Sequence, residues 1–291
     1  MRKRKMAMRK FFLGLSFVSA LAGAAIGVSA PANASISVIP YSVVIQGRER
    51  FGELNLINQT RETKAYEMEW VHMRQNQDQP GYSNLDQSLT PFDITQNMVF
   101  SPRRVTVGPR EAQKIRFALR LGDGQPENGD YRAHLRIRQV SDPSLSVQSD
   151  GEEQRLRLGI GATVSYTLPV IYRVGDTTAT ASIGDISVGT TESGRPRLTI
   201  PVSRNDSPYG IVGHLSVYHR PAGGGRETLV GEVGNAFLFP EISARTFRVP
   251  LHNIEGGLQS GTIRVVLEER LKGTRRNPER VVADRSFPIG H

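Results

Sequence analysis

The chain has 291 residues, with 37 lysines and arginines, 28 aspartates and glutamates, and no cysteine. The absence of cysteine excludes disulfide bonds, thiol catalysis and thiolate metal sites together. Six basic residues lie in the first ten positions, so the formal charge of +9 falls to about +3 without them, which gives little support for nucleic acid binding.

The first 34 residues have the features of a secretory signal peptide. Basic residues precede an apolar run rich in alanine and glycine, and Ala32-Asn33-Ala34 supplies the small residues that signal peptidase requires before its cleavage point. We predict cleavage before Ser35 and export of the remaining chain. An uncleaved membrane anchor is the alternative, but the apolar run is short, and no later segment is apolar enough to span a bilayer.

Seven segments between residues 36 and 174 show the period-two alternation of apolar and polar side chains that is typical of strands. They are 36–45, 51–58, 64–73, 92–107, 112–121, 130–140 and 155–174. Pro40 is best placed at a sheet edge, and Pro102 interrupts the fourth segment, because proline cannot donate a ladder hydrogen bond. The polar stretches 74–90 and 141–154 are predicted to be loops.

Residues 175–178 form a plausible domain junction, and a second set of seven strand-like segments follows it. These segments are 181–188, 197–202, 214–220, 228–239, 245–251, 262–269 and 281–289. Glycine, proline, asparagine or serine lies between them, and no segment has a helical period. The predicted fold is therefore all-β, with two tandem immunoglobulin-like β-sandwich domains at 35–174 and 175–291.

The last segment of the first domain, RLRLGIGATVSYTLPVIYRV at 155–174, is several times longer than an ordinary strand of about 5–6 residues. Its even positions are all apolar or aromatic. The row begins with Leu156, Leu158, Ile160, Ala162 and Val164. We interpret this half as a surplus apolar row that projects towards a partner. The alternative is a long core strand bent by its glycines and Pro169.

The sequence contains no persuasive catalytic or metal-binding set. His214 and His219 are five residues apart, so on one strand they face opposite sides and cannot share a metal ion. The glycines of AGGGR at 222–226 lack the ending of a phosphate-binding loop and predict a hairpin turn. No serine lies in a G-x-S-x-G context. We expect no enzymatic activity, no cofactor, no metal and no small-molecule substrate.

Charged side chains gather on two strand faces of the first domain. They are Glu67 with Glu69, and Arg132 with Arg136 and Arg138, where His134 shares the arginine face. We interpret both faces as solvated, and the histidine as satisfied or solvated. Trp70, the single tryptophan of the chain, is predicted to belong to the core.

Several stretches resemble the PapD-like periplasmic chaperones of pilus and fimbrial assembly. They are LNLINQT at 54–60, FSPRRVTVGPREAQKIRFALR at 100–120, GDYRAHLRIR at 129–138, the strand ending in VIYR at 170–173, and the turn NDSPYG at 205–210. The resemblance covers essentially the whole mature chain and is more specific in the first domain than in the second.

This resemblance implies a chaperone that lends the strand at 155–174 to a pilus subunit whose own sandwich lacks its final strand. Leu156, Leu158, Ile160, Ala162 and Val164 would then enter the subunit groove. The implied location is the periplasm. The implied partners are pilus or fimbrial subunits and an outer-membrane usher, with no nucleic acid.

The chain departs from the family at one place. Family members hold the subunit's terminal carboxylate with a basic pair, and the corresponding positions here are Ser42 and Pro169, neither of which is cationic. Arg48, Arg116 and Arg173 are candidate substitutes. An exported structural or adhesive component of a surface fibre is the alternative function, although both domains show complete strand sets.

Overall fold

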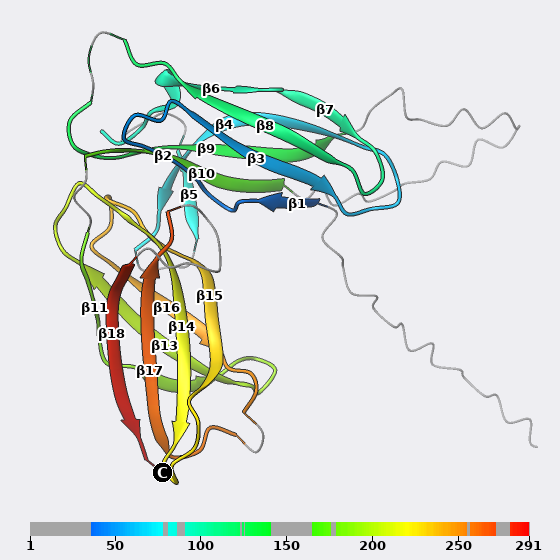
Figure 1. Ribbon diagram of the computed structural model, residues 1–291. Helices are drawn as coiled ribbons and strands as arrows, with labels where there is room; N and C mark the ends of the chain where they lie inside the picture. Colours follow the sequence, from blue (N-terminus) through cyan, green and yellow to red (C-terminus); the bar gives the residue numbers. More distant parts are fainter. Residues whose placement is uncertain are drawn as a thin grey trace, which may run out of the picture. The chain divides into compact units, whose positions relative to one another are not determined.

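The computed structural model describes residues 36–77, 81–85, 91–122, 124, 126–140, 165–175, 179–254, 257–271 and 280–290 (Figure 1). These residues form eighteen β-strands and one short 3₁₀ helix, Thr95–Asn97, which confirms the predicted all-β fold class. None of them belongs to a helix long and apolar enough to cross a membrane. The predicted signal peptide and its cleavage point before Ser35 lie outside the described residues.

Two sheets form the first sandwich. Its strands are β1 (Ile36–Ile39), β2 (Val43–Gln46), β3 (Phe51–Asn58), β4 (Lys64–Gln75), β5 (Tyr82–Leu85), β6 (Met98–Ser101), β7 (Arg104–Val107), β8 (Ala112–Leu119), β9 (Gly129–Val140) and β10 (Ser165–Val174). One sheet has the order β1-β3-β8-β6, and the other has the order β2-β10-β9-β4-β5, with β7 also pairing β4. These orders correspond to the ABED and GFC sheets of an immunoglobulin-like sandwich.

Prolines split two of the predicted strands. Segment 36–45 is interrupted around Pro40, so that β1 belongs to one sheet and β2 to the other. Segment 92–107 is interrupted at Pro102 in the same way, with β6 pairing β8 and β7 pairing β4. The prediction of a single strand over 36–45 is therefore wrong, and the predicted interruption at Pro102 is confirmed. In both segments a residue without a backbone donor lies where the chain changes sheets.

The prediction of a loop over 74–90 is wrong for residues 74–75 and 82–85, which lie in two paired strands, the hairpin arm. Strand β4 continues to Gln75, and β5 pairs with it from Tyr82 to Leu85. The polar composition of this stretch concealed a short edge strand.

Alternating side chains of both sheets fill the interior of the first sandwich. Leu54, Leu56, Ile115 and Phe117 are fully buried, as their alternation predicts. Trp70 is only partly buried; it packs edge-on against Phe100 with ring centres 4.9 Å apart, and its indole N–H donates to the Met98 carbonyl.

A separate interior fills the second sandwich. Its strands are β11 (Ala181–Ile183), β12 (Ser187–Thr190), β13 (Pro196–Arg204), β14 (Ile211–Pro221), β15 (Thr228–Leu238), β16 (Ala244–Pro250), β17 (Gly261–Glu269) and β18 (Arg280–Ile289). One sheet places β11 and β12 along one side of β13 and β16 along the other. The second sheet has the order β15-β14-β17-β18. The turn at 222–226 joins β14 to antiparallel β15, as predicted.

Candidate binding edge

Strand β10 has an open backbone edge. Along its whole length it pairs antiparallel with β9, from Ser165 opposite Arg138 to Val174 opposite Gly129. On its other side it pairs parallel with β2, but only from Val170 to Arg173. Among the described residues, no strand pairs with that side of 165–169. Its free N–H and C=O groups can therefore accept another strand.

The described half of the predicted stretch confirms a strand, and it also shows which way the even row points. Leu168, Val170, Tyr172 and Val174 all belong to the first core cluster. Ser165 and Thr167, on the other face, are exposed. The predicted subunit-binding residues lie outside the described residues. They are Leu156, Leu158, Ile160, Ala162 and Val164.

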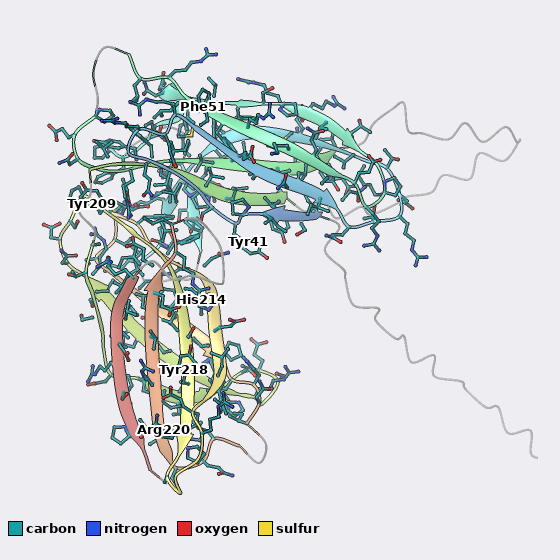
Figure 2. All side chains as sticks on the ribbon, viewed as in Figure 1. Tyr41, Phe51, Tyr209, His214, Tyr218 and Arg220 are labelled. Atoms are coloured by element: carbon teal, nitrogen blue, oxygen red, sulfur yellow. The ribbon has the colours of Figure 1, made fainter. Side chains whose placement is uncertain are left out.

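The open edge of β10 begins where β2 ceases to pair with it. Val43 lies opposite Val170, so Ser42 falls beside Pro169, and before that point the chain crosses to the other sheet as β1. Two large side chains at this crossing remain exposed. Ile39, the last residue of β1, is 50 % exposed, and Tyr41 is 51 % exposed. Figure 2 shows Tyr41. Exposed apolar side chains beside an unpaired strand edge are typical of an interaction surface.

The register of β2 on β10 places Ser42 next to Pro169, and neither side chain supplies a positive charge. Of the three candidate substitutes, Arg116 is exposed on β8, in the sheet that does not contain β10. Arg48 is exposed and follows the last residue of β2, whereas Ser42 precedes its first residue. The structure therefore brings neither arginine together with this pair.

Arg173, the third substitute, is 3 % exposed and already paired. Its Nε and Nη2 lie 2.6 and 2.7 Å from the carboxylate oxygens of Asp130, and its Nη1 lies 2.9 Å from Oε1 of Glu269. Burial alone would lower the pKa of Arg173, but its hydrogen bonds and charge interactions with Asp130 and Glu269 raise it above its ordinary value. We call these three residues the Arg173 cluster.

The Arg173 cluster connects the two sandwiches. Asp130 and Arg173 belong to β9 and β10, and Glu269 ends β17. The NDSPYG turn lies against it, because the Gly210 N–H donates to Asp130 and the Tyr209 hydroxyl donates to the Val174 carbonyl at 2.7 Å (Figure 2). Glu269 also lies 3.1 Å from Arg280, so two arginines compensate the two buried carboxylates, as burial requires.

An apolar cluster lies between the sandwiches as well. It consists of Ile171, Val212, Phe237, Phe239 and Leu271, with Val44 and Tyr82 packed against it. Ile171 comes from β10, on the face opposite the first core. One face of β10 thus packs inside its own sandwich, and the other packs towards the second.

The interpretation of the arginine face as solvated is wrong for Arg132 and His134. Arg132 is 7 % exposed and His134 is 3 % exposed. Phe239 of the second sandwich lies against both of them, and Tyr82 of the hairpin arm lies against His134. Burial, with the nearby charge of Arg132, places the pKa of His134 well below its ordinary value.

For Arg136 and Arg138 the solvated interpretation is confirmed. Arg136 is partly exposed and Arg138 is exposed, and they pair with Glu69 and Glu67 of the neighbouring strand at 2.9 and 2.6 Å. The two glutamates are therefore partners of these arginines rather than a carboxylate pair of their own.

The described residues contain no group of three or more histidines, aspartates and glutamates that could hold a metal ion. His214 lies 3.2 Å from Glu232, whereas the Nε2 of His219 lies 3.1 Å from the Gln259 carbonyl. The two histidines therefore have separate partners, as their spacing predicts.

No protein-family model matches the chain, and no curated protein matches it. Among solved structures, the chain is similar to a chain in the complex of the Salmonella enterica SafA pilin with the SafB chaperone. The identity is 12 % over 88 % of this chain and 96 % of that chain, with a TM-score of 0.43. It is similar to the Pseudomonas aeruginosa CupB2 chaperone at 14 % identity, covering 86 % and 97 % of the two chains, with a TM-score of 0.41. It is also similar to the Acinetobacter baumannii CsuC–CsuE complex of a chaperone and a tip subunit, at 13 % identity over 88 % and 98 %, with a TM-score of 0.42.

Proposed function

We propose that the chain is a periplasmic chaperone of pilus or fimbrial subunits, acting by strand donation. The observation that carries the proposal is the open edge of β10 at 165–169. The nine residues before Ser165 continue the apolar alternation, so a client strand could extend along both parts. By client we mean a subunit whose own sandwich lacks its final strand.

In this mechanism the client lies along β10 and the residues before it. Its backbone would complete the ladder that β2 leaves unpaired before Val170. Leu156, Leu158, Ile160, Ala162 and Val164 would fill the client's groove. Each large side chain contributes about 1.5–3 kcal/mol on burial, before the cost of ordering is subtracted. No covalent bond changes, so the mechanism requires no catalytic group and no cofactor.

The crossing between β1 and β2 would form the other wall of the site. Ile39 and Tyr41 are exposed there and would be covered by the client. Because Ser42 and Pro169 carry no charge, we infer that the client is held by its strand rather than by a carboxylate anchored between these two residues. Release would follow when the client passes to an outer-membrane usher.

Co-expression with small exported β-proteins, followed by purification through a tag on this chain, tests the proposal. A one-to-one complex with a protein that is insoluble when expressed alone is the expected result. Recovery of this chain as a stoichiometric component of surface fibres would instead support the alternative, a structural or adhesive fibre protein.

A further inference from the structure

A second polar cluster also joins the two sandwiches, and an ion pair lies at its centre. Nη1 and Nη2 of Arg132, on β9, lie 3.1 and 2.5 Å from the two carboxylate oxygens of Glu241, in the turn that follows β15. Both side chains are 6 % exposed, and the guanidinium carbon lies 3.9 Å from the centre of the Phe239 ring. A bidentate pair stacked on a ring restricts orientation as well as distance.

Gln75, at the end of β4, binds the same segment of the second sandwich. Its side-chain amide donates to the Phe237 carbonyl at 2.7 Å and accepts from the Phe239 N–H at 2.8 Å. Its backbone N–H donates to Oε1 of Glu241 at 3.0 Å. Gln75 thus makes the hydrogen bonds that a neighbouring strand would make to residues 237 and 239. We call Gln75, Arg132 and Glu241 the Arg132 cluster.

The two polar clusters hold three adjacent strands of one sheet. The Arg173 cluster uses β10 and β9, and the Arg132 cluster uses β9 and β4. Two bodies attached at one cluster can rotate about it, whereas a second attachment opposes that rotation. The apolar cluster between the sandwiches cannot serve as this second attachment, because apolar burial is non-directional. A buried ion pair adds little net stability, so orientation is its main contribution.

We propose that Gln75, Arg132 and Glu241 are positioning residues that fix the second sandwich relative to the strand that receives the client. Capture of the client then depends on this fixed relation. The dependence of capture rests on the proposed function, but the positioning itself is a property of the free protein.

The variant Arg132→Met with Glu241→Met removes the ion pair while keeping side-chain volume and leaving no unpaired buried charge. The matched control is Arg136→Met with Glu69→Met, an ion pair that is more exposed and lies entirely within the first sandwich, on β9 and the adjacent β4. Because the chain has no cysteine, spin labels can be placed at Arg61→Cys and Glu192→Cys, which are exposed, one in each sandwich.

We expect one narrow distribution of label distances in the parent and the control, and a clearly broader one in Arg132→Met with Glu241→Met at a similar melting temperature. Client capture by that variant should weaken about tenfold, since only about a tenth of its molecules would have the arrangement of sandwiches that binds the client. An unchanged distance distribution would overturn the positioning role. A broader distribution with undiminished capture would overturn the link to the client. Failure of the parent itself to capture any client contradicts the proposed function, and the label distances then decide the positioning role alone.

Discussion

The ring of His134 packs against the rings of Tyr82 and Phe239, with ring centres 5.4 and 6.2 Å away, and these two rings also contact each other. Its neighbour on the same face, Arg132, is buried as well. The alternation of β9 predicted that these two side chains share a face, and this is correct. It could not predict what covers that face, because the covering residues Phe239 and Glu241 come from a segment about 100 positions later.

The buried His134 should make stability depend on pH. The unfolded chain takes up a proton near the ordinary pKa of 6.5, whereas in the folded chain burial and Arg132 lower this pKa. The contribution to stability is therefore complete above pH 6.5 and is lost as pH falls below it. Tyr82, whose ring contacts the imidazole, stays neutral through this range because burial raises its pKa.

Urea unfolding at pH 7.5 and 5.5 measures this effect. Between these two pH values His134 should account for a loss of up to about 1.4 kcal/mol in the free energy of unfolding. This is the free energy that corresponds to one pH unit, and pH 5.5 lies one unit below the ordinary pKa. His134→Phe should reduce the difference between the two pH values by that amount. An identical pH dependence in His134→Phe and the parent would show that His134 takes up its proton as readily in the folded chain as in the unfolded chain.

At the scale of elements, proline positions and the β10 pairing decide the architecture. The sequence patterns predicted most strands within a few residues, because alternation reports one buried face directly. They did not predict that 36–45 and 92–107 divide between two sheets, since alternation does not indicate the partner of a strand. The short pairing of β2 with β10, which creates the open edge, follows from that division.

The Arg173 cluster connects β9, β10 and β17, and its removal should be costly. Arg173→Met leaves the buried Asp130 without its arginine partner, whereas Glu269 keeps Arg280 at 3.1 Å, and the loss of one member of a buried pair costs about 3–5 kcal/mol. Arg136→Met, at a partly exposed position, should cost less than about 1 kcal/mol. Urea unfolding followed by Trp70 fluorescence compares the two. Similar losses would mean that the Arg173 cluster does not stabilise the fold.

At the scale of the whole molecule, the sequence predicted an all-β chain of two sandwiches, and the structure has two sandwiches with separate interiors. The joint between them was not predicted, because its members are scattered residues without a periodic pattern. The predicted binding row, from Leu156 to Val164, and the signal peptide remain predictions.

Export is the property of the whole chain on which the proposed location depends. Signal peptidase should cleave after Ala34, so the exported protein should begin at Ser35. Mass spectrometry of the protein from the periplasmic fraction measures this directly. An exported form that retains residues 1–34 would contradict the periplasmic chaperone and favour a membrane-anchored protein.

Strand donation is tested most directly by charges placed in the apolar row. In Leu158→Asp with Ile160→Asp, the client's groove would have to bury unpaired charges at a cost of several kcal/mol. Leu168→Asp, in the same row but inside the first core, is the matched control. Circular dichroism and client co-purification are measured on both. The account predicts that the double variant folds and melts like the parent but no longer holds its client, whereas Leu168→Asp fails to fold or melts far earlier. A double variant that also fails to fold, or one that folds and still holds its client, would contradict strand donation by this row.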